Sequence, residues 1–416
     1  MISRLPVQGL RQRRNSVEEK TNVTRIALLT GGGDKHYAFG LATALTSKNV
    51  FIDFIGSDEL ASPTLDSNPS INFLNLRGDQ NQKASLIKKI GRITLYYLRL
   101  LWFGATARAT IFHILWNNRL ESFDRIILLL YYKLFRRRLV FTAHNVNAAK
   151  RDRVDNLINR STLYIQYHLV DHIFVHTDKM KAELEEEFGV PSAKISVIPY
   201  GINNIVPVTS LSAGEARRRL GVKGGDFAML FFGLIAPYKG LEFLLDALSE
   251  LLKKCHRYRL IIAGEPKWND AYWQKMKYVI TRTGIEAQII QRIEYIPDEE
   301  IEVFFKAADV LILPYTHIFQ SGVQFLAYNF GLPVIATDVG SLKETVVEGR
   351  TGFICAPCDS VDLAKTIERY FRSDSFCKLE QQRPLIKEHA DAEYSWEKVA
   401  TITERVYSNL IAGCQA

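Results

Sequence analysis

QSGVQFLAYNFGLPVIAT, residues 320–337, opens with a polar Ser-Gly turn and continues into an apolar stretch. The stretch ends at Gly331-Leu-Pro333, where Gly and Pro interrupt helical structure, and a Val-Ile-Ala-Thr run follows. This order is typical of a loop, a helix and a short strand. We expect the unit to be built around a ligand.

Similar units recur along the whole chain, because short apolar runs alternate with helical patterns in both halves. In the first half the expected strands are Arg25–Thr30, Val50–Ile55, Ile71–Leu76, Thr110–Trp116, Arg138–His144, His172–Thr177 and Lys194–Pro199. In the second half they are Phe227–Phe232, Tyr258–Ile262, Ala287–Ile290, Val310–Leu313 and Pro333–Thr337. Strands that alternate with helices favour an α/β fold in which a parallel, doubly wound sheet is used twice.

Length and composition allow two globular domains. A chain of 416 residues with 47% hydrophobic and 24% charged residues is too long for one ordinary core. A Val/Thr/Ser-rich connector places the domain boundary near residues 204–214. We expect a disordered basic arm, two α/β domains and a terminal helix that packs back across the domains, over residues 1–22, 23–205, 206–390 and 391–416.

The charge balance and the cysteines restrict the partner and the compartment. A net charge of +8 favours an anionic partner, such as phosphates or a lipid surface. Five cysteines without a regular framework predict reduced thiols and a cytosolic protein. Cys355-Ala-Pro-Cys358 matches C-x-x-C, but its surroundings favour a strand that runs into a turn over a redox or zinc site.

Two glycine-rich turns are candidate phosphate sites. Gly31-Gly32-Gly33 follows the first expected strand, and its glycines either admit a phosphate or sugar or serve a purely steric purpose. In the second half, Phe232-Gly233 is followed by Pro237-Tyr-Lys239-Gly240. A lysine at the start of a helix is electrostatically unfavourable unless an anion joins it, so we expect a diphosphate there rather than a solvated lysine.

These positions, in this order, resemble the retaining nucleotide-sugar glycosyltransferases of the family-four (group 1) type, which have the GT-B architecture. The matching features span roughly residues 24 to 405. They are the first Gly turn, Thr142-Ala-His144, Val197–Asn203, Phe232-Gly233 with Pro237–Gly240, Ile262-Ala-Gly264, Ala308–Pro314, Gly331–Thr337 with Gly340, Gly349–Gly352 and Tyr394-Ser-Trp396. The resemblance implies two Rossmann-like domains that face a central cleft, with the acceptor domain first and the nucleotide-sugar donor domain second.

The resemblance also implies roles for individual residues. Gly32 and Gly33 would face the cleft near the donor phosphates and the acceptor. Lys239 would neutralise the diphosphate leaving group, and His144 would contact the donor sugar near the reacting centre. The donor nucleotide would be bound by Gly233 and Gly264 and, largely through backbone groups, by the segment around Ile296.

The sequence departs from the family pattern at the loop and helix before Gly331. The two glutamates that most members place there correspond to Ile318 and Leu326, and Leu234 replaces a usual arginine. This looks like a Ser-Gly variant of the family, in which Ser321 and the backbone amides of Ser321 and Gly322 bind phosphate at the helix start. Gln320 and Gln324 are interpreted either as sugar or ribose contacts or as solvated helix residues.

Metal chemistry has no ligand set in the sequence. No Asp-x-Asp is present, so leaving-group charge would fall on Lys239 and helix termini, and we expect neither a metal nor a cofactor. The histidines other than His144 are scattered over different expected elements, for which strand packing is the simpler explanation: His36, His113, His168, His172 and His176.

The segment from residue 86 to 138 raises the question of a membrane. Residues 86–103 mix cations with Leu, Tyr and Trp, and a second basic cluster lies at Lys133 and Arg136–Arg138. Ordinary helices packed on the sheet, with solvated basic residues, are the alternative. We expect peripheral attachment to an anionic inner leaflet, no spanning helix, no secretory signal in the first 22 residues and no nucleic-acid partner.

Together these features predict a cytoplasmic, peripheral-membrane hexosyltransferase. It would move a sugar from a nucleotide-diphosphate sugar to a lipid-linked or glycan acceptor, with retention, in polysaccharide or glycolipid synthesis. Two rivals stay open. One is a nucleotide-sugar epimerase on the same scaffold, and the other is a non-catalytic nucleotide-sugar-binding protein.

Overall fold

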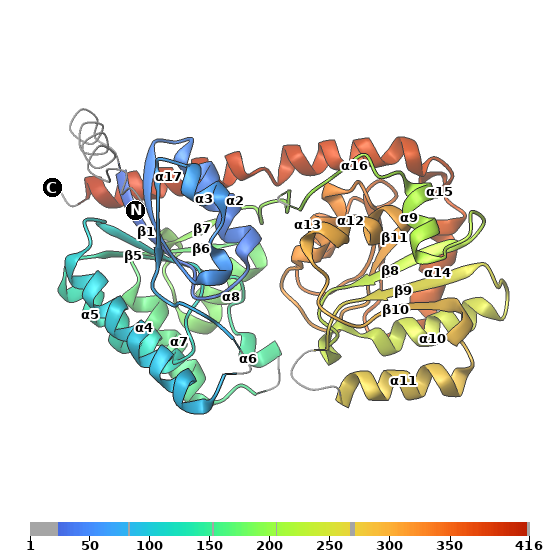
Figure 1. The fold of residues 1–416 in the computed structure, drawn as a ribbon, viewed down its shortest axis with the longest axis horizontal. Coiled ribbons are helices and arrows are strands. Elements are labelled where there is room, and N and C mark those ends of the chain that lie inside the picture. Colours follow the sequence, from blue (N-terminus) through green and yellow to red (C-terminus); the bar gives the residue numbers. More distant parts are fainter. Residues whose placement is uncertain (1–23, 82–83, 152–153, 205, 267–270, 414–416) are drawn as a thin grey trace, which may run out of the picture. The chain divides into compact units, whose positions relative to one another are not determined.

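The computed structural model, drawn in Figure 1, covers most of the chain. It describes residues 24–81, 84–151, 154–204, 206–266 and 271–413. The predicted basic arm at residues 1–22 lies outside these residues. The chain forms two compact units. Unit 1 contains the residues up to Thr142, Ile165–Ile173 and the residues from Ala400 onward, and unit 2 contains Ala143–Tyr164 and Phe174–Val399.

The first sheet has seven strands in the order β3-β2-β1-β4-β5-β6-β7. Its strands are β1 (Thr24–Leu29), β2 (Val50–Gly56), β3 (Ile71–Asn75), β4 (Ile111–Ile114), β5 (Arg138–Thr142), β6 (His172–Val175) and β7 (Ile195–Val197). The helices in this half are α2 (Lys35–Thr46), α3 (Pro63–Ser67), α4 (Leu86–Thr106), α5 (Leu129–Leu134), α6 (Ala148–Arg151), α7 (Leu157–Leu169) and α8 (Asp178–Phe188).

The second sheet has six strands in the order β10-β9-β8-β11-β12-β13. Its strands are β8 (Phe227–Phe232), β9 (Tyr258–Ala263), β10 (Ile289–Arg292), β11 (Val310–Leu313), β12 (Val334–Thr337) and β13 (Gly352–Cys355). The helices are α9 (Ala213–Leu220), α10 (Leu241–Leu252), α11 (Ala271–Thr283), α12 (Asp298–Ala307), α13 (Gly322–Asn329), α14 (Ser360–Phe371), α15 (Asp374–Cys377) and α16 (Leu379–Glu393). The last helix, α17 (Trp396–Ala412), belongs to unit 1 from Ala400 onward.

The predicted α/β class and the doubly wound parallel sheets are confirmed. The central strands pair in parallel, β1 with β2 and β4, and β8 with β9 and β11. The strand predicted at Ala287–Ile290 is displaced, because residues Glu286–Gln288 form a 3-10 turn and the strand starts at Ile289. Cys355 ends β13 and Cys358 lies in the following turn, so the strand-to-turn interpretation of the C-x-x-C segment is confirmed.

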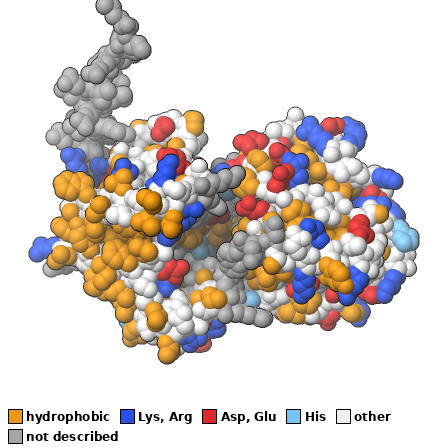
Figure 2. Space-filling view, turned by 60° about the horizontal axis from the view of Figure 1, so that its bottom comes forward, with side chains coloured by type: hydrophobic (Ala, Val, Ile, Leu, Met, Phe, Trp, Pro, Cys, Tyr) orange, Lys and Arg blue, Asp and Glu red, His pale blue; other side chains and the backbone are white. Residues whose placement is uncertain are grey.

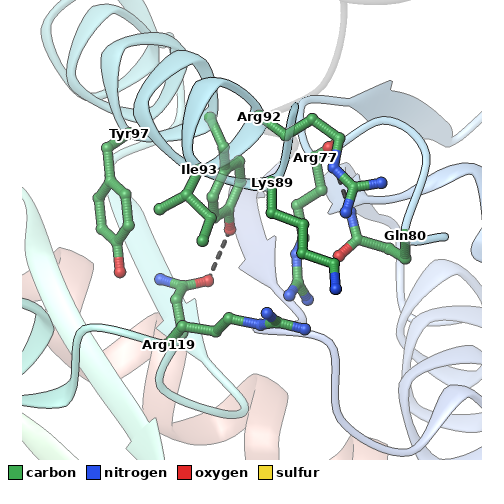
Figure 3. Close-up of a pocket in the computed structure, with 9 residues that line it drawn as sticks. Arg77, Gln80, Lys89, Arg92, Ile93, Tyr97 and Arg119 are labelled. Carbon is green, nitrogen blue, oxygen red and sulfur yellow. Dashed lines mark hydrogen bonds between the residues drawn. The ribbon is translucent and has the colours of Figure 1, made fainter. Parts of the chain in front are cut away.

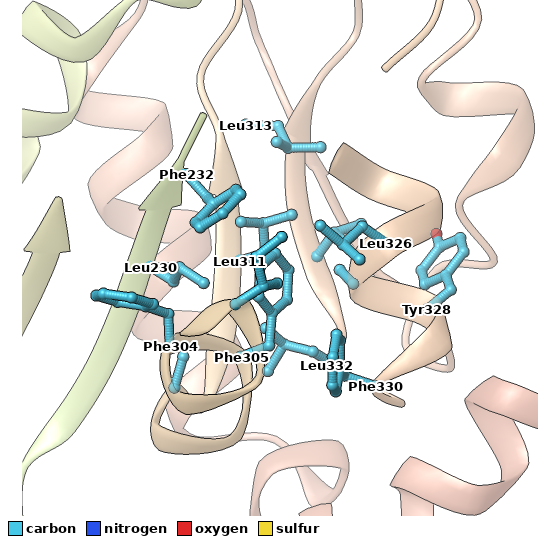
Figure 4. Close-up of a cluster of buried hydrophobic side chains, with 14 of the residues drawn as sticks. Leu230, Phe232, Phe304, Phe305, Leu311, Leu313, Leu326, Tyr328, Phe330 and Leu332 are labelled. Carbon is cyan, nitrogen blue, oxygen red and sulfur yellow. The ribbon is translucent and has the colours of Figure 1, made fainter. Parts of the chain in front are cut away.

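Strand β8 shows how the second sheet is buried on both faces. Leu230 and Phe232 belong to one buried cluster together with side chains of α12 and α13, part of which is shown in Figure 4. Met229 and Phe231 belong to another, together with side chains of α10 and α14. Successive residues of a strand point to opposite faces, so a continuous apolar run is what this central strand requires.

The strand order reverses once in each sheet. The reversal lies between β1 and β4 in the first sheet and between β8 and β11 in the second. At such a point the connections that leave the two central strands run to opposite faces, which opens a crevice at the carboxyl ends of the strands. The Gly31-Gly32-Gly33 turn follows β1, and Gly233 follows β8.

Buried histidines support the predicted packing role. His113 in β4 bonds Tyr407 Oη through Nδ1 (2.6 Å) and Thr142 Oγ1 through Nε2 (2.7 Å). Burial lowers the pKa of His113 to about 3 and that of His172 to about 4, so both are neutral near pH 7. Among the described residues, no group of three or more His, Cys, Asp or Glu side chains is placed to hold a metal ion.

Candidate active site

The candidate site in unit 2 lies at the ends of β8 and β9. A Cβ on Gly264 would lie 1.9 Å from the carbonyl oxygen of Gly233, so these two predicted donor-binding glycines sit directly against each other. Gly264 has φ +145° and Gly233 has φ +90°, values that side-chain-bearing residues rarely adopt. A Cβ on Gly233 would lie 3.8 Å from Lys239 Nζ and 3.5 Å from a methyl group of Val323.

Lys239 is buried, with 5% of its surface exposed. It ends a single 3-10 turn, Pro237–Lys239, between β8 and α10. Its Nζ donates a hydrogen bond to Tyr315 Oη (2.7 Å) and lies 4.6 Å from the centroid of the Tyr315 ring. The solvated-lysine alternative is therefore wrong. The 3-10 turn with Lys239 follows β8, and Tyr315 follows β11. The two meet because β8 and β11 are neighbours at the reversal of the strand order.

Tyr315 links Lys239 to the Ser-Gly turn. Its hydroxyl lies 3.2 Å from Ser321 Oγ. Burial raises the pKa of Tyr315, so the phenol keeps its proton. Because its oxygen accepts from the ammonium group, the phenol donates to Ser321, its remaining hydrogen-bond partner among the described residues. The Ser321 hydroxyl proton is then directed away from Tyr315, toward a ligand.

The predicted helix start at Ser321 and Gly322 is confirmed. Ser321 is the N-cap of α13, which begins at Gly322, and its side chain makes no capping hydrogen bond to the helix. The first N–H groups of a helix have no intrahelical acceptor and favour an anion. Ser321 Oγ, the N–H groups of α13 and the Lys239 ammonium group thus form a set of donors suited to a phosphate.

Two glutamines lie close to Ser321 in the chain. Gln324 is fully buried and its Nε2 donates to Tyr328 Oη (3.0 Å) and Thr345 Oγ1 (2.7 Å), so the solvated interpretation of Gln324 is wrong. These bonds tie α13 to the following loop, while Gln324 Oε1 has no hydrogen-bond partner among the described residues, and its contact with a ligand stays a prediction. Gln320 Oε1 is buried and has no hydrogen-bond partner among the described residues, which fits a ligand contact.

Ile318, Leu326 and Ile296 are buried in the apolar cluster of the second sheet. Leu326 points into this cluster beside Phe305 and Leu311 (Figure 4). A carboxylate in its place would be desolvated among apolar side chains. For Ile296, burial of the side chain agrees with a contact made through the backbone. Leu234 is 40% exposed.

His144 lies two residues beyond the end of β5 and pairs with His176, which directly follows β6. The distance from His144 Nδ1 to His176 Nε2 is 3.0 Å. His176 Nδ1 lies 3.3 Å from the carbonyl oxygen of Ile198, which accepts, so Nδ1 of His176 carries the proton. Burial lowers the pKa of His176 to about 4, against backbone hydrogen bonds that raise it, and the ring is neutral near pH 7.

The neutral His176 determines the tautomer of His144. Since Nε2 of His176 has a lone pair and no proton, it accepts a hydrogen bond from Nδ1–H of His144. The proton of a neutral His144 is therefore on Nδ1, and its Nε2 is an acceptor or base. An unprotonated Nε2 can accept a hydrogen bond from a hydroxyl group.

Tyr200 connects the histidine pair to α13 within unit 2. Its ring packs edge-on against His176, with centroids 4.9 Å apart, and stacks on Phe325 of α13, with centroids 5.2 Å apart. A Cβ on Gly322 would lie 3.3 Å from its hydroxyl oxygen. A bulkier residue than glycine at position 322 would thus press on Tyr200.

The first glycine-rich turn belongs to unit 1. A Cβ on Gly33 would lie 2.0 Å from the Trp116 ring, and one on Gly32 would lie 1.8 Å from the guanidinium group of Arg77. The Asp34 carboxylate accepts from the N–H groups of His36 and Tyr37 and so caps α2. Steric crowding therefore accounts for glycine at Gly33, and a phosphate at the start of α2 would meet the Asp34 carboxylate. Contact of Gly32 and Gly33 with a ligand stays a prediction.

Three residues of the site could not be singled out from the sequence. Tyr315 follows β11 in a motif that is otherwise apolar, His176 reads as a strand residue, and Tyr200 lies in a loop. Their roles come from contacts between segments distant in the chain, with Lys239, His144 and Phe325 respectively. One feature of the sequence could have indicated them. Each lies one to three residues beyond the carboxyl end of a parallel strand, which is where such sheets bind ligands.

Comparison with known proteins identifies the class to which this site belongs. The family described as Glycosyltransferase Family 4 matches residues 31–204, and the family described as Glycosyl transferases group 1 matches residues 212–388. The two matches together take up most of the chain. The chain therefore belongs to the GT-B glycosyltransferases of this type, as the sequence motifs predicted.

Relatives and solved structures agree with this assignment. A D-inositol 3-phosphate glycosyltransferase from Corynebacterium efficiens is 28% identical over 285 residues, which are 66% of either chain, so the match spans just under two thirds of the relative. Sucrose-phosphate synthase from Thermosynechococcus elongatus has a TM-score of 0.75 at 19% identity, covering 94% of this chain and 100% of the other. Anabaena HepE in complex with UDP and glucose has a TM-score of 0.71 at 18% identity, covering 94% and 99%.

His176 provides a test of the histidine pair. In His176→Phe the ring still packs against Tyr200, but Nδ1–H of His144 loses its acceptor. We expect the turnover number for sugar transfer to fall roughly tenfold or more, because a buried hydrogen bond of about 1–3 kcal/mol is lost. Nucleotide affinity should stay at the wild-type value, and His176→Gln, which keeps an acceptor, should recover part of the rate. An unchanged turnover number in His176→Phe would show that the pair has no role in catalysis.

Proposed function

We propose that the protein is a hexosyltransferase that uses a nucleotide-diphosphate sugar and transfers the sugar with retention to a lipid-linked or glycan acceptor, in polysaccharide or glycolipid synthesis. The observation that carries this proposal is the buried Lys239 ammonium group, held by Tyr315 beside Ser321 and the start of α13. Such a group of donors is suited to the charge that develops on a diphosphate leaving group.

The names of related proteins support a nucleotide-sugar donor. Solved structures of Anabaena HepE contain UDP, UDP with glucose, or UDP-glucose. The curated relatives named D-inositol 3-phosphate glycosyltransferase are glycosyltransferases with a soluble phosphorylated acceptor in their name. By this proposal, Gly233 and Gly264 lie against the nucleotide and Gln320 contacts the sugar or ribose.

The proposed reaction needs no protein nucleophile. The acceptor hydroxyl attacks the anomeric carbon on the face from which the diphosphate leaves, and the hydroxyl proton passes to the departing phosphate oxygen. Lys239, Ser321 and the N–H groups of α13 stabilise the negative charge on that phosphate. His144 Nε2 accepts a hydrogen bond from a sugar hydroxyl and orients the donor.

Lys239→Ala tests the leaving-group role. We expect sugar transfer to fall at least a thousandfold, since a buried charge-assisted contact made in the transition state is removed.

Thermal unfolding in the presence of UDP, GDP and their sugars should show which nucleotide stabilises the wild-type protein. Uniform failure of all these ligands, or normal transfer by Lys239→Ala, would contradict the proposal. Product analysis without acceptor distinguishes transfer from epimerisation.

Metal independence is part of the proposal, because Lys239 and helix N–H groups can carry the charge that a metal would otherwise neutralise. We expect transfer by the purified protein to keep its rate in excess EDTA and to gain nothing from added Mg²⁺ or Mn²⁺. A rate that falls in EDTA and returns with a divalent cation would contradict this part of the proposal.

The proposal places the protein in the cytoplasm, at the inner face of the membrane. Helix α4 buries Tyr96, Tyr97, Leu100 and Gly104, while many of its apolar side chains are exposed. The exposed apolar face of α4 consists of Leu86, Ile87, Ile90, Leu95, Leu98 and Trp102, of which Ile87 is 85% and Trp102 73% exposed. In Figure 2, apolar side chains form a broad patch on the surface of the part of the molecule that contains α4.

Helix α4 contains no acidic residue, and its basic residues Lys88, Lys89, Arg92 and Arg99 fit an anionic surface. Leu130 and Leu134 of α5 are also exposed, and the two helices are in contact. Among the described residues, no helix combines the length and apolarity that would let it cross a membrane. We propose that α4 lies in the interfacial plane of the bilayer.

Sedimentation with vesicles tests the membrane proposal. Wild-type protein should bind vesicles of phosphatidylcholine with 30% phosphatidylglycerol and bind pure phosphatidylcholine much less, because both apolar area and positive charge contribute. Ile87→Asn with Trp102→Asn should reduce binding at least tenfold. Leu385→Asn, an exposed apolar position in α16, serves as the control and should bind as wild type does. Equal binding by all three proteins would contradict a role for α4.

A further inference from the structure

Unit 1 contains a pocket at the carboxyl end of its sheet (Figure 3). The pocket is open to solvent, and the space within it, open solvent included, is about 400 Å³. The segments that line it follow β3 and β4 or belong to α4, and the lining residues are Arg77, Gln80, Lys89, Arg92, Ile93, Tyr96, Tyr97, Asn118 and Arg119. Its place close to the reversal between β1 and β4 is where parallel sheets bind ligands.

The pocket is strongly basic. Four of its nine lining residues are Arg or Lys and none is Asp or Glu. Arg77, Lys89 and Arg119 come from three different segments and extend toward one another (Figure 3). Arg92 is paired with Asp79 (3.1 Å). Within the described part of the chain, no carboxylate forms an ion pair with Arg77, Lys89 or Arg119.

Arg77 lies against the glycine-rich turn. A Cβ on Gly32 would lie 1.8 Å from one of its terminal nitrogens, so the guanidinium group occupies the space where the side chain of another residue would begin. The same group lies 5.5 Å from the centroid of the Tyr96 ring. A planar guanidinium group can bind an anion through two parallel N–H groups.

The floor of the pocket is polar and rigid. Tyr96 Oη donates to Asn118 Oδ1 (2.6 Å), and Asn118 Nδ2 donates to Asp124 Oδ1 (3.2 Å). Tyr97 Oη donates to the same carboxylate oxygen (2.9 Å). These bonds fix Asn118 and therefore the loop that carries Arg119. Burial raises the pKa of Asp124 to about 6, and the carboxylate lies behind the amide of Asn118 rather than in the lining.

We propose that this pocket binds a phosphate group carried by the acceptor. The inference rests on the proposed function, because it identifies the acceptor of that transferase as a phosphorylated molecule. Three converging cations without carboxylate partners match the charge of a phosphate monoester or diphosphate, and guanidinium groups bind its oxygens in pairs. The phosphate is either part of a soluble phosphorylated sugar or polyol, or the headgroup of a lipid lying against α4, which contributes Lys89.

Phosphate binding is tested by isothermal titration with inorganic phosphate, in protein that carries Lys239→Ala so that the donor site contributes little. Arg77→Gln with Arg119→Gln should weaken phosphate affinity at least tenfold. The matched control, Lys48→Gln with Arg108→Gln, removes the same charge from a half-buried and an exposed position of unit 1 outside the pocket and should leave the affinity unchanged. Equal weakening by both pairs would overturn the proposal, because general charge rather than the pocket would then be responsible.

Two further measurements make the result decisive. If Arg77→Gln with Arg119→Gln folds poorly, Lys89→Gln with Arg119→Gln replaces it, because this second variant leaves Arg77 and its contact with Gly32 in place. We expect it to weaken phosphate affinity by the same factor. Vesicles with phosphatidic acid, compared with equally charged vesicles of phosphatidylglycerol, separate the lipid from the soluble source. Preference for phosphatidic acid that depends on Arg77 and Arg119 supports a lipid monoester, and binding of free glucose 6-phosphate supports a soluble acceptor. If the protein binds none of inorganic phosphate, phosphatidic acid and glucose 6-phosphate, the proposal is overturned.

UDP or GDP affinity distinguishes this proposal from the proposed function. With Lys239 intact, the pocket variants should bind the nucleotide as wild type does. Loss of nucleotide affinity in these variants would overturn the proposal of a separate acceptor-phosphate pocket while leaving the donor role intact. Failure of the wild-type protein to bind any nucleotide would instead contradict the proposed function.

Discussion

The contact between the Lys239 ammonium group and the Tyr315 hydroxyl is the interaction on which the donor site depends. A buried ammonium group is costly unless its charge is compensated. The Tyr315 phenol accepts a hydrogen bond from this ammonium group and also contacts Ser321 at the start of α13, at the position where β8 and β11 separate. Together these donors are suited to an anion.

Neutral groups support this charge. His176 stays uncharged near pH 7 because it is buried, and through its Nε2 lone pair it directs the tautomer of His144. Tyr200 packs against this pair and against Phe325 of α13. Gln324 joins α13 to Thr345 and Tyr328 through its Nε2. Tyr200 thus connects the histidine pair to α13, the helix that the proposed function assigns to the donor phosphate.

The helix start after the first glycine turn of unit 1 differs from the helix start at Ser321 in unit 2. The start of α2 is capped by the Asp34 carboxylate, so in the proposed phosphate pocket the donors are side chains rather than helix N–H groups. The guanidinium group of Arg77 lies against Gly32. The exposed apolar side chains of α4 lie on the same helix as Lys89 of the basic pocket.

Periodicity in the sequence alone determined the α/β class, the strands of both sheets and the helix start at Ser321, because apolar runs and glycine turns are local signals. The order of the motifs determined the family. Tertiary structure decided which polar residues meet. Gln324 and Leu326 lie on α13 as expected, yet their burial depends on how the helix rotates against the sheet. The partners of Lys239, His144 and Arg77 are supplied by strands and turns distant in sequence, and no local pattern encodes such contacts.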